Sequence, residues 1–279
     1  MIVIRLKGGL GNQMFQYALG RRLALERKVS LWLDLSSFED RTYAFARDYG
    51  LDAFQTCAPR LIARSRLPLY DRVALFLARP APVLEKAYHA LQALPPGRSL
   101  CFEGYWQREE YFAPVAETIR KEFQLKAPLA PERQKIAAQY DDSAVSIHVR
   151  RGDYVLKPEF TTYFGTCAAE WYGAAIAIIR ERVKSPRFFV FSDDPDWARV
   201  NLPLREHPVQ FIDPRPDKRD AEDLHLMSRC AHHIIANSSF SWWAAWLNPM
   251  PDKVIIAPKL WYKGAPEIPV HVPASWLRL

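Results

Sequence analysis

The sequence predicts an α/β fold in which two domains face each other across a cleft. Short apolar, β-rich runs alternate with helical patterns along the chain, as in folds with mostly parallel sheets. Runs such as Phe188–Phe191 are continuously apolar, which is typical of strands covered on both faces. A short segment with two prolines, Leu125–Pro131, separates the two halves. We therefore place the domains at 1–128 and 129–279.

The expected elements follow from these runs in chain order. We expect strands at Ile2–Leu6, Leu31–Leu35, Ser99–Gly104, Ala144–Arg150, Phe188–Ser192, Val209–Asp213, His233–Ala236 and Val254–Ala257. Helical patterns lie between them, at Gln13–Glu26, Trp171–Val183 and Glu222–Ala231.

Length and composition set the class of protein. The chain has 279 residues, 49% of them hydrophobic and 25% charged, which suits one large domain or two of medium size. Its four cysteines are widely spaced and form no CxxC pair, which favours reduced thiols over a zinc site or a disulfide framework. The N-terminus enters a strand without the apolar core of a signal peptide, and no apolar run approaches the roughly 20 residues of a membrane span. We therefore expect a cytoplasmic protein.

The net charge of +7 is unevenly distributed. Arg60–Arg98 holds seven basic and two acidic residues, and its apolar side chains interleave with arginines between Arg64 and Arg79. This pattern fits either a solvated helix packed against its own domain or a peripheral contact with the inner membrane surface. The aromatic-interleaved basic patterns of RNA-binding modules are absent, so we expect no nucleic-acid partner.

The first motif is a glycine-rich stretch, Gly8–Ala18, with the sequence GGLGNQMFQYA, between a strand and a helix. Glycines at such a turn let backbone N–H groups approach a ligand at the positive end of the helix. Its spacing is not that of a dinucleotide fingerprint. The adjacent amides of Asn12 and Gln13 can bind sugar hydroxyls or phosphate oxygens, while Asn12 as a helix N-cap is the structural alternative.

The second motif, HVRRGD, runs from His148 to Asp153 at the end of a predicted strand. Such ends lie at the rim of open α/β sheets, where ligands bind, and two guanidiniums there suit a diphosphate. In an extended strand His148 and Arg150 point to one side and Arg151 to the other. Arg151 then binds either Asp153 or a neighbouring strand, and a structural salt bridge at the strand end is the alternative for the whole motif.

The third motif, VFSDDPDW, spans Val190–Trp197 and also follows a buried strand. The carboxylates of Asp193 and Asp194 can accept hydrogen bonds from a guanine base or cap the next helix. We expect capping rather than ligand contact from Asp194 and Asp196. The pair also resembles a metal-binding DxD motif, but the arginines already supply positive charge, so we expect no metal.

The fourth motif, Ile235–Trp246, leads from a strand through a serine-rich loop into a helix. Ser238, Ser239 and Ser241, with the free N–H groups of the first helical turn, form a potential anion site. We expect the tryptophans that follow to pack this helix into the domain core.

Taken together, these motifs resemble those of the bacterial alpha-1,2-fucosyltransferases of glycosyltransferase family 11. The similar segments are GGLGNQMFQYA at 8–18, FEGYWQ at 102–107, HVRRGDY at 148–154, FSDDPDW at 191–197 and NSSFSWWAAWL at 237–247. They span almost the whole chain in the same order.

The resemblance implies a GT-B-like fold of two Rossmann-like domains, an acceptor-side domain at 1–128 and a GDP-sugar-binding domain at 129–279. It implies inverting transfer of L-fucose from GDP-fucose to O2 of a terminal β-galactose on an oligosaccharide, with no cofactor or metal. By similarity, Arg150 neutralises the β-phosphate, His148 and Asp193 approach the guanine, and the loop around Ser239 holds the pyrophosphate. The catalytic residues are then Arg150, Asp153 and Asn12, and the donor-binding residues are His148, Arg151, Asp193, Ser238, Ser239, Phe240, Ser241, Gly11 and Gln13.

Some choices stay open at this point. A fucosyltransferase of other linkage, a non-catalytic GDP-sugar- or glycan-binding protein, and a peripheral membrane scaffold are the alternatives. The general base is not identified, and its candidates are Asp153, Glu159, Asp40 and Glu109, with Asp153 favoured by position. Acceptor specificity is expected in the loops Tyr43–Tyr49 and Tyr154–Phe164.

Overall fold

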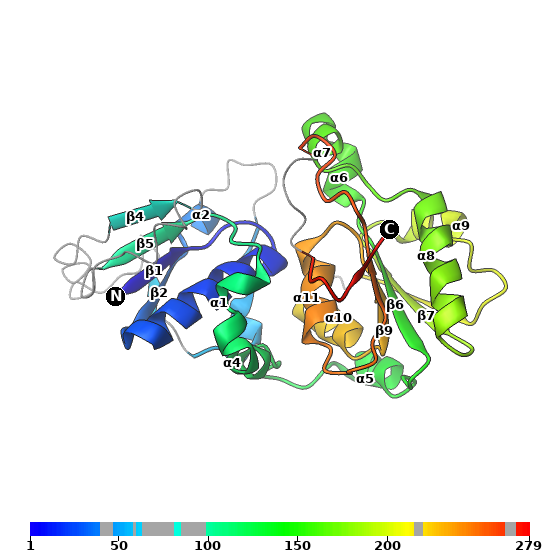
Figure 1. The fold of residues 1–279 in the computed structure, drawn as a ribbon, viewed down its shortest axis with the longest axis horizontal. Helices are drawn as coiled ribbons and strands as arrows, with labels where there is room; N and C mark the ends of the chain where they lie inside the picture. Colours follow the sequence, from blue (N-terminus) through cyan, green and yellow to red (C-terminus); the bar gives the residue numbers. More distant parts are fainter. Residues whose placement is uncertain (40–46, 58–59, 63–80, 85–98, 215–219, 266–271) are drawn as a thin grey trace. The chain divides into compact units, whose positions relative to one another are not determined.

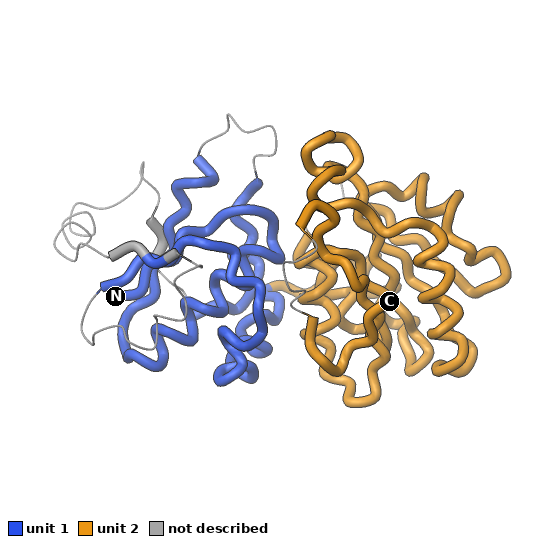
Figure 2. The backbone as a smooth tube through the Cα atoms, turned by 45° about the horizontal axis from the view of Figure 1, so that its top comes forward, with its two compact units in different colours: residues 1–126 blue, residues 127–279 orange. Residues whose placement is uncertain are grey.

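The computed structural model describes residues 1–39, 47–57, 60–62, 81–84, 99–214, 220–265 and 272–279. The chain divides into two compact units, residues 1–126 and 127–279 (Figure 2). The division lies two residues before the boundary expected from the sequence.

The first unit contains a five-stranded parallel sheet with the order β3-β2-β1-β5-β4. The 18-residue helix α1 connects β1 to β2. Gly20 allows this helix to pack closely on the sheet, because a Cβ at Gly20 would lie 2.4 Å from the side chain of Ile4. The strands are β1 (Ile2–Arg5), β2 (Leu31–Asp34), β3 (Arg60–Ile62), β4 (Ala81–Leu84) and β5 (Leu100–Glu103). The helices and 3-10 turns are α1 (Leu10–Arg27), α2 (Ser36–Glu39), η1 (Leu51–Ala53), η3 (Glu109–Tyr111), η4 (Ala113–Val115) and α4 (Ala116–Glu122).

The second unit contains a six-stranded parallel sheet with the order β11-β10-β9-β6-β7-β8. Figure 1 shows α8 and α9 on one face of this sheet and α10 and α11 on the other. The strands are β6 (Ala144–Val149), β7 (Arg187–Ser192), β8 (Val209–Ile212), β9 (His232–Ile234), β10 (Ile255–Ala257) and β11 (Leu277–Arg278). The helices are α5 (Pro131–Ala137), α6 (Gly152–Leu156), α7 (Pro158–Tyr163), α8 (Ala169–Arg182), α9 (Pro195–Asn201), α10 (Asp220–Ser228) and α11 (Ser239–Leu247).

The period-2 alternation of β6 divides its side chains between the two faces of the sheet. Val145, Ile147 and Val149 join the core beneath α8 and α9. Ser146 and His148 point to the opposite face, where Ser146 Oγ lies 2.7 Å from His233 Nδ1. All six residues of β6 are buried, as is typical of a parallel strand covered on both faces.

The strand order defines where each unit can bind a ligand. In the second unit the chain runs outward from β6 through β7 to β8 and then returns to the other side of β6 as β9. Loops on the two sides of such a reversal lead to opposite faces of the sheet, which opens a crevice at the carboxyl ends of the two strands. The switch point therefore lies between β6 and β9. In the first unit it lies between β1 and β5.

Candidate functional site

The switch point of the second unit brings three of the four predicted motifs together. HVRRGD begins with the last two residues of β6, the acidic motif begins with the last three residues of the adjacent strand β7, and the serine loop follows β9 on the other side. In the first unit the glycine-rich loop follows β1, and the FEGYWQ segment forms and follows β5. The sequence motifs thus converge on the two places where this topology favours ligand binding.

Arg150 is the centre of the ion-pair network in the second unit. Its Nη1 donates to Asp193 Oδ2 at 2.7 Å, its Nη2 donates to Asp153 Oδ1, and its guanidinium lies 5.1 Å from the centre of the Tyr154 ring. Burial alone would lower the pKa of Arg150, but the carboxylates of Asp193 and Asp153 raise it above its ordinary value. Arg150 is therefore charged and held in one orientation at the end of β6.

Arg151 points to the neighbouring strand rather than to Asp153. Its Nε donates to Asp194 at 3.1 Å, and its guanidinium lies 4.1 Å from the centre of the Trp197 ring. Asp194 also caps α9, because its Oδ1 accepts from Trp197 N. The expected capping role of Asp194 is confirmed, and of the two partners expected for Arg151 the neighbouring strand is the correct one.

Asp193 binds the loop that carries both arginines. Its second oxygen accepts from the backbone N–H of Arg151 at 2.8 Å. Gly152 fits directly against it, since a Cβ at Gly152 would lie 2.6 Å from Asp193 Oδ2. Both carboxylate oxygens of Asp193 are thus engaged within the protein, and contact with guanine stays a prediction.

The arginine pair is not an uncompensated positive site. Arg150 and Arg151 face three carboxylates, those of Asp153, Asp193 and Asp194, so this cluster has a formal charge of −1. The structural salt bridge considered as an alternative at this strand end is therefore present. A diphosphate that bound here would have to compete with carboxylates for the guanidinium of Arg150.

His148 presents a hydrogen-bonding atom that has no partner in the part of the chain that the structure describes. Its side chain is 7% exposed, and its Nδ1 is buried without a hydrogen bond in the described part of the chain. The ring lies 5.6 Å from that of Phe240, which connects the end of β6 to the start of α11. Burial, with a smaller effect of Arg150, lowers the pKa of His148 to about 3, so the ring is neutral. A buried unsatisfied nitrogen at a switch point is a candidate ligand contact.

The serine loop divides into exposed and buried parts. Ser238 is the N-cap residue of α11 and makes no side-chain cap hydrogen bond, while Ser239 and Phe240 are partly exposed in the first turn. The positive end of the α11 dipole therefore lies beside His148. Ser241 does not fit its predicted role as a donor ligand, because it is fully buried and its Oγ donates to Ser238 O. The predicted packing of the tryptophans is confirmed, since Trp242, Trp243 and Trp246 are all at most 3% exposed.

The glycine-rich loop of the first unit binds the FEGYWQ segment. Gln107 Nε2 donates to Asn12 Oδ1 at 2.6 Å, which joins the two sides of the switch point between β1 and β5. Gly8 has a φ of +80°, in the left-handed region, and a Cβ there would lie 2.6 Å from Asn12 Nδ2. Gly9 is the N-cap of α1, so Asn12 lies inside the helix and the N-cap alternative for it is wrong.

Two predicted donor ligands in this loop, Gln13 and Gly11, are buried, and their contact with the donor stays a prediction. Gln13 is fully buried, and its amide donates to the carbonyls of Gly8 and Asp48 and accepts from Gly50 N. It therefore shapes the loop and has no exposed surface for a substrate. Gly11 is buried in the first turn of α1.

Two residues of the site had no role assigned from the sequence. Gln107 belongs to a motif that carried the family resemblance, but only the structure shows that it binds Asn12. Asn237 is 4% exposed, and its Nδ2 donates to the carbonyls of Phe164 and Trp261, which ties the serine loop to two distant segments. A polar residue inside an otherwise apolar strand-to-loop junction is the available sequence signal.

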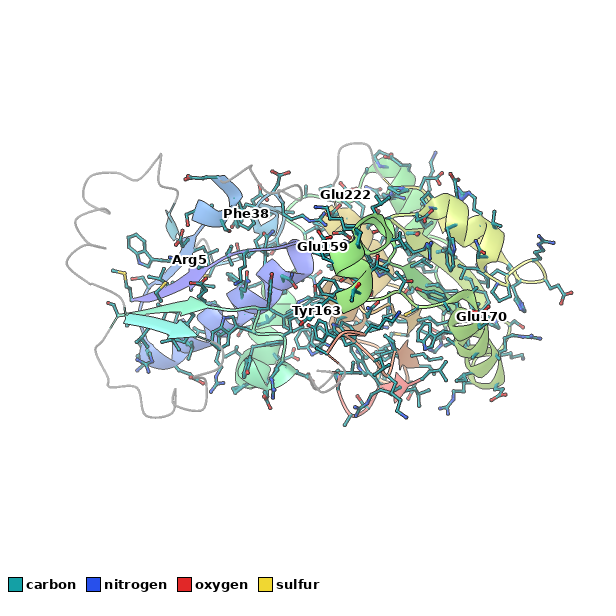
Figure 3. All side chains as sticks on the ribbon, turned by 90° about the horizontal axis from the view of Figure 1, so that it is seen from above. Arg5, Phe38, Glu159, Tyr163, Glu170 and Glu222 are labelled. Carbon is teal, nitrogen blue, oxygen red and sulfur yellow. The ribbon has the colours of Figure 1, made fainter. Side chains whose placement is uncertain are left out.

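The candidate bases lie in different surroundings. Asp153 is paired with Arg150, which engages the carboxylate that a base would need. Glu159 is exposed on α7, where Figure 3 labels it, and Glu109 begins η3 in the first unit. Asp40 lies outside the described residues. The segment Tyr154–Phe164, expected as a specificity loop, is largely helical as α6 and α7.

Some sequence expectations concern other parts of the chain. All four cysteines are free thiols. Among the described residues, no cluster of three or more histidine, cysteine or acidic side chains is arranged to hold a metal ion, and no helix has the length and apolar composition of a membrane span. Most of the basic stretch Arg60–Arg98 and of the loop Tyr43–Tyr49 lies outside the described residues, so the peripheral membrane contact stays a prediction.

Comparison with known families decides the class of protein. Residues 1–267 match the model of glycosyl transferase family 11. The chain belongs to glycosyltransferase family 11. It is 33% identical to an alpha-1,2-colitosyltransferase of Escherichia coli over 94% of this chain and 93% of that protein. It is 31% identical to the O-antigen biosynthesis glycosyltransferase WbnK of Escherichia coli over 98% of this chain and 99% of that protein. It is also 29% identical to the mouse galactoside 2-alpha-L-fucosyltransferase Sec1, over 89% of this chain and 64% of that protein.

Solved structures confirm the fold. The fucosyltransferase NodZ from Bradyrhizobium superposes with a TM-score of 0.52 at 17% identity, over 89% of this chain and 93% of NodZ. POFUT1, solved with GDP-fucose, superposes with a TM-score of 0.54 at 12% identity, over 92% of this chain and 97% of POFUT1. The protein therefore has a GT-B-like fold made of Rossmann-like α/β units with parallel sheets.

Proposed function

We propose that this family 11 glycosyltransferase transfers L-fucose from GDP-fucose to O2 of a terminal β-galactose, with inversion at the anomeric carbon. The observation that carries the proposal is the meeting of Arg150, the unsatisfied Nδ1 of His148 and the first turn of α11 at the switch point of the second unit. The mouse relative is named a galactoside 2-alpha-L-fucosyltransferase, which supports L-fucose as the transferred sugar, a galactoside acceptor and the alpha-1,2 linkage.

The donor nucleotide is assigned to the second unit. The neutral ring of His148 offers its buried Nδ1 to the nucleoside part of GDP, since this nitrogen has no hydrogen-bond partner among the described residues. The backbone N–H groups at the start of α11, at Ser239 and Phe240, face the pyrophosphate. In this assignment Ser238 borders the anion site and Ser241 holds the loop in shape.

Arg150 supplies the cation at the leaving group. In an inverting transfer the bond from the anomeric carbon to the β-phosphate oxygen breaks while the acceptor O2 bonds to the same carbon. Negative charge then builds on the diphosphate, and a preorganised guanidinium stabilises it more in the transition state than in the ground state. The β-phosphate takes over at least one hydrogen bond that Arg150 now makes to Asp193 or Asp153.

Asp153 is better assigned as a positioning residue than as the base. Its carboxylate accepts from Arg150 and fixes the direction of the guanidinium. The acceptor hydroxyl must still lose its proton, and among the described candidates Glu159 and Glu109 are not part of this ion-pair network. We assign Asn12 and its partner Gln107, both in the first unit, to contact with the sugar of the donor.

A second donor is favoured by one specific observation. The chain is 33% identical over nearly its full length to an alpha-1,2-colitosyltransferase. Colitose is the 3-deoxy analogue of fucose, so GDP-colitose would offer the same nucleotide and diphosphate to the second unit. The two donors differ only where a hydroxyl of the sugar needs a hydrogen-bonding partner.

Incubation with each donor and lactose tests the proposal. We expect a fucosylated trisaccharide from GDP-fucose, with NMR correlations that place the new linkage at O2 of galactose. A higher kcat/KM with GDP-colitose would show that colitose and not fucose is the preferred sugar, and the proposed alpha-1,2 linkage would be unaffected. If the protein releases GDP from neither donor in the presence of galactose-terminated acceptors, the proposal is contradicted.

A further inference from the structure

A cluster of five aromatic rings lies next to the arginine loop and is not used by the proposed donor site. Tyr154 stacks on Phe164 with centroids 4.6 Å apart and an interplanar angle of 9°, and Phe164 also contacts Phe160 and Tyr163 at 5.4 and 5.0 Å. Tyr262 lies 5.4 Å from Tyr163. We call this cluster, formed by Tyr154, Phe160, Tyr163, Phe164 and Tyr262, the aromatic platform.

The platform reaches the protein surface instead of the core. Tyr163 is 40% exposed, although it contacts two other rings, and Figure 3 labels it on α7. Val155 and Leu156 on α6 are 39% and 80% exposed. Exposed apolar and aromatic surface beside a binding site is a candidate ligand contact.

The platform is held rigidly, as a binding surface has to be. Gly264 N donates to Tyr163 O at 2.9 Å, so the segment that carries Tyr262 is tied to the end of α7. Gly264 permits this approach, since a Cβ there would lie 3.1 Å from Tyr163 Cα. Asn237 Nδ2 donates to Phe164 O and to Trp261 O, which joins the same two segments to the serine loop.

The platform is continuous with the donor site on two sides. The guanidinium of Arg150 lies 5.1 Å from the centre of the Tyr154 ring, and Tyr154 stacks on Phe164. Asn237 belongs to the loop that leads to Ser239. A sugar that rested on the platform would therefore lie beside the two loops assigned to the leaving diphosphate.

We propose that the aromatic platform, with Tyr163 at its exposed edge, is the subsite that stacks a pyranose ring of the acceptor glycan. A β-galactose ring has one face made of C–H groups, which suits the negative face of an aromatic ring, and its hydroxyls remain available at the edge. A flat, rigid ring loses little conformational entropy when it binds a sugar. This inference rests on the proposed function, because it assigns the acceptor of that reaction.

Kinetics of Tyr163 variants test the subsite. Tyr163→Leu keeps apolar bulk but removes the flat face, so we expect the KM for lactose to rise about tenfold. We expect kcat to change by less than about threefold, and GDP affinity measured by calorimetry to stay unchanged, because the donor site is intact. Tyr163→Phe keeps the ring and should restore the lactose KM. Val200→Ala, which truncates a 74% exposed side chain on α9, is the matched surface control.

A binding measurement separates this inference from the proposed function. Saturation-transfer NMR of lactose with the GDP-loaded protein reads the subsite without any transfer. If the wild type binds lactose but transfers nothing from GDP-fucose, the proposed reaction fails while loss of the signal in Tyr163→Leu still supports the subsite. An unchanged lactose KM and NMR signal in Tyr163→Leu would overturn the inference. So would a variant whose sole defect is loss of self-association or of binding to phospholipid vesicles.

Discussion

Replacing Arg150 with alanine and with lysine separates the charge of this side chain from its shape. Alanine removes the cation between Asp153 and Asp193, so the formal charge of the cluster falls from −1 to −2. Lysine keeps the charge, but a single ammonium cannot reproduce the fork that contacts both carboxylates. Only the alanine variant therefore loses the positive charge, whereas both variants lose the guanidinium that contacts two carboxylates at once.

The expected magnitudes follow from these contacts. A lost transition-state donor costs roughly 3–4 kcal/mol, so both variants should lose about 100- to 1000-fold in turnover. The side chains of Asp153 and Asp193 are 10% and 27% exposed, and solvent therefore screens part of the repulsion that Arg150→Ala creates. We expect it to lower the free energy of unfolding by about 1–2 kcal/mol, with a smaller loss for Arg150→Lys.

Three measurements on the same preparations check this reasoning. Steady-state rates give turnover, calorimetry gives GDP affinity, and urea unfolding gives stability. Arg150→Ala should bind GDP more weakly than Arg150→Lys, and Asp193→Asn in the alanine background should restore part of that affinity by removing one negative charge. Turnover within tenfold of the wild type in a folded Arg150→Ala variant would refute the role of Arg150 at the leaving group.

Three further predictions follow from other parts of the structure. EDTA should leave turnover intact, because Asp193 and Asp194 already bind arginines and a backbone N–H; a loss of activity that magnesium or manganese restores would show that they hold a metal. Asn12→Ala removes the acceptor for Gln107 and should lower turnover, measured by steady-state rates, about tenfold or more. GDP affinity, measured by calorimetry, should change less than about threefold. Loss of GDP binding as complete as in Arg150→Ala would contradict the assignment of Asn12 to turnover and of Arg150 to GDP binding. Burial, with smaller effects of nearby cations, lowers the pKa of His233 to about 3. The folded protein therefore holds this ring neutral, and the stability that results is fully present above the ordinary histidine pKa of about 6.5. It is lost as the pH falls from about 6.5 toward 3. Between pH 7 and pH 5 the urea-derived free energy of unfolding should fall about 2 kcal/mol more in the wild type than in His233→Gln, and equal slopes would show that His233 is not the cause.

The fold could be predicted from the sequence where the pattern was long and regular. Each of the eight expected strands lies within two residues of an observed one, because continuously apolar runs bounded by polar turns identify buried parallel strands. The strands β3, β4 and β11 were not predicted. Their sequences, RLI, APVL and LR, each contain an arginine or a proline and do not form the continuous apolar, β-rich run that identified the other strands.

The candidate site could be predicted in its location but not in its internal pairing. Motifs at strand ends placed Arg150 and the serine loop at one edge of the sheet, and the strand order agrees with this placement. The sequence could not show which carboxylate binds which arginine, because Asp153 and Asp193 reach Arg150 from different segments. For the same reason Gln13 and Ser241 were assigned to the ligand, although backbone groups in the folded chain already engage them.

A crystal structure with GDP would show whether Arg150 and the start of α11 bind the leaving diphosphate. We expect the β-phosphate to contact the Arg150 guanidinium and backbone N–H groups at the start of α11, with His148 Nδ1 bonded to the nucleoside. Arg150 should also give up a hydrogen bond to Asp193 or Asp153. A diphosphate bound elsewhere, with both ion pairs of Arg150 intact and His148 Nδ1 still without a partner, would contradict these expectations.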